Sequence, residues 1–486
     1  MKTSPHPQWA LKHKKKGTEL RHLGGHYYLY EVTSKWNPEK KRSQKITGKL
    51  LGKITKENGF IESDKARLRK QKMSIQKVET KEYGISCLVN GYLNEYMPLL
   101  QKHFPEQWQT IIALTYGRLL HQSPLKNIGF HFHHSYLSEE LTTLDLSGKS
   151  LGHFLKELGT HRNKLVGFFK EFSKADDCIL FDGTDITSES HKIELCELGK
   201  SKKGVYQSLI NTMFVFSVGL KIPIYYRLLP GNIKDIKSFK LCLKESGVKN
   251  ATIIADKAFY SETNIKELDS EKLKYILPLK RDSSLIDYSI LKANIKEKFE
   301  GYFQHEGRFI WYYSIKLENN KTVYVYLDEE LKMQEQKDYL CRIEKQIETY
   351  TIEAFYQKQH VFGSIALYSN CSKDTTPQKI YTNYKCRGEV ENMFDTLKNI
   401  VEGDITYMQN EQTLEGWMFI NYIALHWYYK IYQLLIQNDL IQKYSTMDFF
   451  MMLKEIRIVK INDEWHKAEI IQRTIDLLKK VGIDIT

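Results

Sequence analysis

Two short apolar runs in the middle of the chain each stop at an aspartate, and this feature constrains the fold more than any other. Residues 178–182 end in Asp182 and precede Gly183, while residues 252–256 end in Asp256. Each run is typical of a buried strand, and the glycine is expected to end the first one. In open α/β sheets, ligands bind at the carboxyl ends of strands. The sequence therefore predicts a sheet that brings two distant acids to one edge.

A third acid lies on a helix predicted over residues 382–400. At 100° per residue, four polar side chains share one stripe about 60° wide. They are Tyr384, Arg387, Glu391 and Lys398. The apolar stripe beside them consists of Val390, Met393, Phe394, Leu397 and Ile400. Such a helix buries one face and presents an acid along its border. Scattered surface charges are the alternative for the helix alone, and a cap or turn is the alternative for each aspartate.

Three carboxylates at one sheet edge would form a site for hard cations. The predicted catalytic and metal-binding acids are Asp182, Asp256 and Glu391. Carboxylate oxygens suit Mg²⁺ or Mn²⁺, and two such ions about 3.5–4 Å apart can activate a water or a 3′-hydroxyl and stabilise a leaving oxygen. On the helix, Arg387 and Lys398 are expected to contact DNA phosphates, and Tyr384 to add a hydroxyl contact or packing. Asp185 competes with Asp182 as the first acid, but the predicted strand end favours Asp182.

The net charge of +13 is concentrated in the first 75 residues, which hold 19 basic and six acidic side chains. The remaining residues are balanced. This asymmetry points to a polyanionic partner, and a generic basic tail is the alternative. Strands predicted at 26–32 and 45–54 would form a basic ribbon, with Lys35, Lys40, Lys41 and Arg42 along their connection. Lys12, Lys14, Lys15 and Lys16 are expected to form a mobile arm.

A chain of 486 residues is too long for one ordinary core, so several domains are expected. Patterning predicts an α/β fold whose mixed sheet has flanking helices, with a β-rich insertion before the third acid. The expected parts are a basic N-terminal DNA-binding module (1–75), a helical domain (76–174), a catalytic core (175–295 and 381–435), the insertion (296–380) and a C-terminal helical region (436–486).

No segment has the character of a signal peptide or a membrane span, and the seven cysteines include no C-x-x-C pair. These features predict a cytoplasmic protein, associated with the nucleoid when bound to DNA.

The pattern Tyr384-x2-Arg387-x3-Glu391-x6-Lys398 resembles the third-acid motif of one large group of insertion-sequence DDE transposases. Asp182-Gly-Thr resembles the first-acid strand of that family, and Ile254-Ala-Asp256-Lys-Ala-Phe its second-acid segment. Gly231-Asn232-x2-Asp235 resembles a turn often found between them. The likeness covers about residues 175–430. It implies an RNase H-like core and cut-and-paste transposition with divalent metal, in a dimeric complex on double-stranded transposon ends and target DNA.

Ala258 departs from the family pattern, which commonly has glycine there. An alanine would be strained if the backbone needed a positive φ, and would be a mild change otherwise. Two other functions remain open from the sequence. One is a metal-dependent DNA nuclease without strand transfer, and the other is a catalytically inactive DNA-binding derivative.

Overall fold

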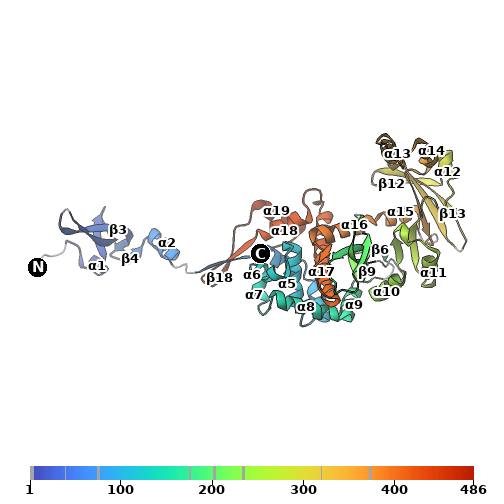
Figure 1. The fold of residues 1–486 in the computed structure, drawn as a ribbon. Helices are drawn as coiled ribbons and strands as arrows, with labels where there is room; N and C mark the ends of the chain where they lie inside the picture. The colour runs from blue at the N-terminus through green and yellow to red at the C-terminus, as the bar shows by residue number, and fades with distance from the viewer. Residues whose placement is uncertain are drawn as a thin grey trace. The chain divides into compact units, whose positions relative to one another are not determined.

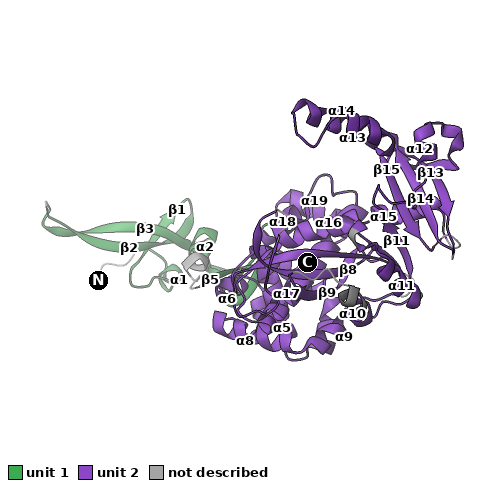
Figure 2. Ribbon diagram, turned by 45° about the vertical axis from the view of Figure 1, so that its right-hand side comes forward, with its two compact units in different colours: residues 1–81, 457–469 green, residues 82–456, 470–486 purple. Residues whose placement is uncertain are grey.

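The structure is a computed structural model and describes residues 5–38, 40–73, 77–174, 177–200, 204–231, 236–318, 320–371 and 375–485. The chain forms two compact units (Figure 2). The first contains Met1–Lys81 and Arg457–Glu469, and the second contains Glu82–Ile456 and Ile470–Thr486. No helix among the described residues is long and apolar enough to cross a membrane.

The first unit is built on two sheets. One has the order β1-β2-β3-β4, with strands Thr18–Leu23, His26–Asn37, Arg42–Thr55 and Gly59–Glu62. The other joins β5 (Val78–Glu82) to the hairpin β17 (Arg457–Ile461) and β18 (Glu464–Lys467). Helix α2 spans Asp64–Met73. The C-terminal region expected to be helical therefore also contains a hairpin.

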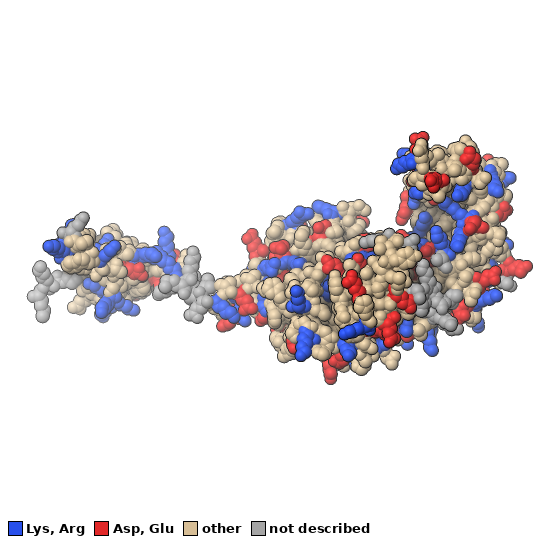
Figure 3. Space-filling view, viewed as in Figure 1, with Lys and Arg blue, Asp and Glu red and all other residues tan. Residues whose placement is uncertain are grey.

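The basic ribbon is longer than predicted, because β2 and β3 pair almost to the turn between them, with Asn37 opposite Arg42. A short helix precedes the lysines of the predicted arm, and the mobility of Lys12, Lys14, Lys15 and Lys16 stays a prediction. Helix α1 (Gln8–Leu11) packs on the sheet, with Ala10 buried and Trp9 in edge contact with Tyr27. Figure 3 shows Lys and Arg side chains spread over this module.

The second unit begins with helices that enclose an apolar core. They are α3 (Gly84–Asn90), α4 (Tyr96–His103), α5 (Trp108–His121), α6 (Leu125–His133), α7 (Leu137–Glu140), α8 (Gly148–Thr160) and α9 (Arg162–Lys170). The long helix α17 (Glu411–Gln437) packs against α5 and α8 (Figure 1). Helices α18 (Thr446–Lys454) and α19 (Gln472–Val481) complete the C-terminal part.

An 11-stranded mixed sheet forms the rest of the second unit, so the fold is α/β with many helices. Its main path runs β12-β13-β14-β15-β11-β10-β6-β8-β7, while β16 pairs with β6 and β9 with β8. The strands are β6 (Cys178–Ser188), β7 (Glu197–Lys200), β8 (Tyr206–Ser217), β9 (Ile222–Pro230), β10 (Thr252–Ala255), β11 (Lys274–Pro278), β12 (Gly301–His305), β13 (Arg308–Lys316), β14 (Thr322–Asp328), β15 (Ser364–Ser369) and β16 (Ile405–Thr406).

The strands of the predicted insertion continue this sheet, because β15 pairs with both β14 and β11. Helices α13 (Glu329–Glu344) and α14 (Ile352–Lys358) belong to the same segment (Figure 1). The other helices are α10 (Ile236–Ser246), α11 (Glu262–Ser270), α12 (Ser289–Ala293), α15 (Pro377–Lys385) and α16 (Gly388–Asp395). The short helical turns are η1 (Lys257–Phe259), η2 (Lys296–Lys298), η3 (Gln359–Val361) and η4 (Thr396–Ile400).

Two glycines let α8 and α17 cross closely. A Cβ on Gly159 would come nearer than 3.0 Å to the carbonyl oxygen of Gln412, and one on Gly416 would do the same to Leu155. These neighbours are backbone atoms and cannot rotate away. Gly152, also on α8, has no neighbour within 4 Å of an added Cβ and provides a matched control.

We expect Gly416→Ala to lower the free energy of unfolding by about 1–3 kcal/mol, because the two helices would be forced apart. Gly152→Ala should be neutral or stabilise by about 0.5–1 kcal/mol, since alanine is the better helix former. Chemical unfolding followed by circular dichroism measures both. Equal stability of the two variants would contradict the close crossing.

His426 of α17 is fully buried, and burial lowers its pKa to about 3. Its Nε2 donates to the carbonyl oxygen of Pro223 at 2.6 Å, so Nδ1 is left to accept from the Tyr96 hydroxyl at 3.3 Å. The folded protein therefore holds this imidazole neutral at pH values where an unfolded histidine is protonated.

This difference makes stability depend on pH. Below the ordinary histidine pKa of about 6.5 the unfolded chain binds one more proton here, so stability falls by about 1.4 kcal/mol per pH unit as pH drops towards 3. His426→Gln should remove this contribution, whereas His191→Gln, at an exposed site, should leave it. Urea unfolding between pH 7 and 5 compares the three proteins, and an unchanged slope in His426→Gln would contradict the assignment.

Candidate active site

Strand register brings the first two predicted acids together. Strands β6 and β10 are parallel, with Phe181 opposite Ala255 in the last pair. Asp182 and Asp256 are the next residue on each strand, so they leave the paired region side by side. The main-chain N–H groups that follow them support both side chains. Gly183 N donates to Asp182 Oδ1 at 2.8 Å, and Lys257 N donates to Asp256 Oδ1 at 2.6 Å.

Asp182 does not end its strand, so that prediction was wrong. Strand β6 continues through Gly183 to Ser188 because it pairs with antiparallel β8 from Ile179 to Thr187. A glycine weakens a strand but does not stop one that is paired along its length. The two aspartates come together where the parallel pairing of β6 and β10 stops, which is the end of β10 and not the end of β6. Asp185 lies three residues further along β6, so alternation directs its side chain to the opposite face from Asp182.

The helix predicted over residues 382–400 is three segments, which corrects the single stripe. Helix α15 ends at Lys385 and α16 begins at Gly388, with 3₁₀-type bonds in between, such as Glu389 N to Cys386 O at 2.9 Å. Glycine is a poor helix former, which favours a break there. The π-helical turn η4 then follows α16. Tyr384, Glu391 and Lys398 therefore belong to α15, α16 and η4 respectively.

Arg387, at the start of α16, lies among all three acids. Its Nη2 is 3.6 Å from Asp182 Oδ2 and 3.5 Å from Glu391 Oε1, and its Nη1 is 3.3 Å from Asp256 Oδ1. Because Asp182 Oδ2 and Glu391 Oε1 both contact Nη2 of Arg387, the distance between these two oxygens cannot exceed the sum of the two contact distances. Arg387 is 22% exposed, Asp182 19%, Asp256 39% and Glu391 64%. The three acids therefore face one guanidinium at a site that water can reach.

The charges around Arg387 govern its pKa. Burial acts to lower the pKa, but the carboxylates of Asp256 and Asp182 and a hydrogen bond with Tyr384 raise it above the ordinary arginine value. Burial raises the pKa of Tyr384 in turn. The guanidinium therefore stays charged and acts as an internal counterion. The sequence identified these residues, but it assigned Arg387 to phosphate and gave no sign that it would pair with the acids.

The three acids fit a hard divalent cation, because their carboxylate oxygens surround a position that the positively charged guanidinium of Arg387 now occupies. As placed here, however, no group of three His, Cys, Asp or Glu in the described ranges is arranged to hold a metal ion. The acids are gathered around Arg387 instead. A divalent cation would compete with the guanidinium for the same oxygens.

The remaining predicted residues lie close by in sequence. Lys398 is half-buried in η4, seven residues after Glu391. Ala258 lies in the 3₁₀ turn η1, a conformation of negative φ, so its backbone needs no glycine. The turn predicted to involve Asn232 and Asp235 lies outside the described residues.

Comparison with known proteins places this site in a family. The family described as "Transposase DDE domain" matches residues 173–427. Among solved structures, the piggyBac transposase synaptic complex with hairpin DNA is similar at 13% identity and a TM-score of 0.40, over 71% of this chain and 68% of that chain. No curated protein matches. Because the family match covers more than half of the sequence and includes all three acids, the chain belongs to the DDE transposase domain family.

Proposed function

We propose that the protein is the transposase of an insertion sequence, which binds terminal inverted repeats and catalyses metal-dependent strand cleavage and transfer. One observation carries the proposal: Asp182, Asp256 and Glu391 surround a single point, although 209 residues separate the first from the last. Members of the DDE family generally depend on divalent metal.

In this proposal the three acids hold Mg²⁺ or Mn²⁺. Two such ions would supply the activation of a water or 3′-hydroxyl and the stabilisation of the leaving oxygen. Lys398 and Arg387 contact DNA phosphates near the scissile bond, and Tyr384 orients Arg387 through its hydroxyl. Arg387 can do so only when its hold on the carboxylates is relaxed, because its ion pairs use the same N–H groups.

The proposed catalytic core is RNase H-like and consists of residues 175–295 and 381–435, whose strands follow the order β9-β8-β6-β10-β11. Residues 296–380 form the insertion, and 76–174 and 436–486 the flanking helical parts. Residues 1–75 form the DNA-binding module, which is supported by the basic hairpin of β2 and β3. A homodimer on paired transposon ends completes the proposal.

We expect Glu391→Gln to reduce cleavage of DNA from the gene's flanks by at least about 100-fold, the size typical of losing one transition-state contact. DNA binding should persist. Glu389→Gln, two residues away on α16, is the matched control and should cleave normally. Cleavage is measured on labelled ends with Mg²⁺, and undiminished cleavage by Glu391→Gln would refute the catalytic assignment. Joining of the cut end to target DNA separates a transposase from a nuclease.

Arg387→Ala should leave three carboxylates without their internal cation. In EDTA we expect its free energy of unfolding to fall by about 1 kcal/mol, a value limited by the solvent exposure of the pairs. Added Mg²⁺ should then stabilise this variant more than the parent protein, because it relieves repulsion among the acids. Arg281→Ala, which breaks a surface pair with Glu335, is the control. Equal Mg²⁺ responses in both variants would contradict the counterion role.

A further inference from the structure

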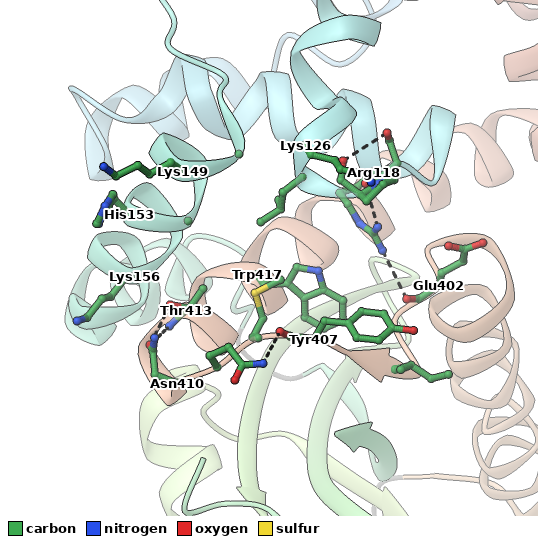
Figure 4. Close-up of a pocket in the computed structure, with 18 of the residues that line it drawn as sticks. Arg118, Lys126, Lys149, His153, Lys156, Glu402, Tyr407, Asn410, Thr413 and Trp417 are labelled. Atoms are coloured by element: carbon green, nitrogen blue, oxygen red, sulfur yellow. Dashed lines mark hydrogen bonds between the residues drawn. The ribbon is translucent and has the colours of Figure 1, made fainter. Parts of the chain in front are cut away.

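A pocket of about 820 Å³ lies in the second unit (Figure 4), and none of the three acids is among its described lining residues. Its walls come from the end of α5 and the start of α6, the first half of α8, residues 402–410 and the start of α17. This volume is within the range of pockets that enclose a small organic ligand. A duplex could lie across its mouth but could not enter it.

The pocket is lined by an excess of positive charge. The basic lining residues are Arg118, Lys126, Lys149, His153 and Lys156, while Glu402 is the one acid among the described lining residues. Lys149, His153 and Lys156 follow one another on α8 along one side of the pocket (Figure 4). All three are exposed, as is Lys126. Such a surface attracts phosphate groups.

Aromatic side chains stand opposite these cations. Tyr407 is 82% exposed, and Trp417 reaches the pocket from α17 although it is only 5% exposed. Because every base has a π-face, an exposed aromatic beside lysines is the pattern that binds unpaired nucleotides. Neither ring is used by the proposed catalytic chemistry.

The segment that carries Tyr407 is held firmly. Arg118 donates to the carbonyl oxygen of Val401 at 2.5 Å, and Gln122 donates to that of Ile400 at 3.0 Å. Thr187 N donates to Asp404 O at 2.8 Å, and β16 pairs in parallel with the end of β6. The main chain on either side of β16, from which Tyr407 follows directly, is therefore anchored to α5 and β6.

Strand β6 runs from the acids to the pocket. Thr187, paired with Ile405 of β16, lies five residues after Asp182 on β6, which is about 17 Å along the strand. One strand of B-DNA rises about 3.4 Å per phosphate, and an unpaired strand can extend further per nucleotide. A DNA strand that follows β6 from the acids would thus reach the pocket within about five nucleotides.

We propose that this pocket binds an unpaired segment of DNA, with a base stacked on Tyr407 and phosphates contacted by Lys149 and Lys156. The inference rests on the proposed function and adds a substrate feature to it: the DNA is single-stranded a few nucleotides from the reacting phosphate. Duplex DNA would contact only the exposed lysines of the pocket, because its bases are stacked within the duplex and cannot stack on Tyr407.

The test measures binding of the full-length protein to two DNAs, a blunt duplex and the same duplex with a five-nucleotide single-stranded extension. We expect Tyr407→Ala to weaken binding of the extended DNA by about 5- to 150-fold, the effect of losing one stacked base, with blunt-duplex binding unchanged. Tyr356→Ala, at another exposed tyrosine (62%) that does not line the pocket, should change neither. Equal affinities of Tyr407→Ala and the parent protein for the extended DNA would overturn the proposal.

A charge variant gives an independent readout. Lys149→Ala/Lys156→Ala should reduce the slope of log affinity against log salt by about 1.4 for the extended DNA, because two single-strand phosphate contacts are lost. Lys266→Ala/Lys337→Ala, at exposed sites outside the pocket lining, should leave the slope unchanged. An equal loss on blunt and extended DNA would mean a duplex-binding surface and would refute the pocket assignment.

Photo-crosslinking identifies the contact directly. A 5-iodouracil in the extension should crosslink to the segment with Tyr407, and crosslinks confined to other segments would also overturn the proposal. Binding and crosslinking need no cleavage, so they can be scored in Glu391→Gln. Failure of the proposed catalysis is therefore distinguishable from failure of this inference.

Discussion

The arrangement of the catalytic region depends on one guanidinium. Three carboxylates from β6, the end of β10 and α16 would repel one another if they were brought together alone. Arg387 lies within 3.6 Å of all three and offsets that repulsion. Individually, half-exposed ion pairs contribute little to stability. Arg387 matters because one positive charge shared by three carboxylates allows them to lie close together. A cation-binding site also requires several carboxylates to lie close together.

The scaffold that supports this cluster is made by ordinary packing. The parallel register of β6 and β10 places two aspartates side by side through main-chain pairing. Helix α16 is then fixed over the sheet by its buried face, with Val390, Met393 and Phe394 in the core and Phe394 in edge contact with Phe214. Glu391 lies in the first turn of α16, where a negative charge is favoured by the helix dipole. Packing of the buried face of α16 thus determines the position of the Glu391 carboxylate.

The sequence predicted the strands and the acids well where periodicity was strong. The strands at residues 274–278 and 308–316 and the helix at 411–437 have the expected limits, because their apolar patterns stop at turn residues or caps. The extension of β6 past Gly183 could not be foreseen, because it depends on pairing with β8, a partner distant in sequence. The break at Gly388 has a local signal, a poor helix former, but α16 resumes at once, so the periodicity masks it.

The role of Arg387 was hidden for a different reason. A basic residue next to a predicted metal-binding acid is readily interpreted as a phosphate ligand, and the sequence contains nothing that ranks carboxylate partners against phosphate partners. In the DNA-free protein the partners of Arg387 are carboxylates, because the oxygens close to its guanidinium are those of Asp182, Asp256 and Glu391. In the proposed DNA complex, metal ions would replace the guanidinium as partners of the carboxylates, and DNA phosphates would replace the carboxylates as partners of the guanidinium. The phosphate role of Arg387 therefore stays a prediction for the DNA-bound protein, whereas its pairing with the acids is what the structure shows, and the exposed carboxylate of Glu391 is the one most accessible to ions from solvent.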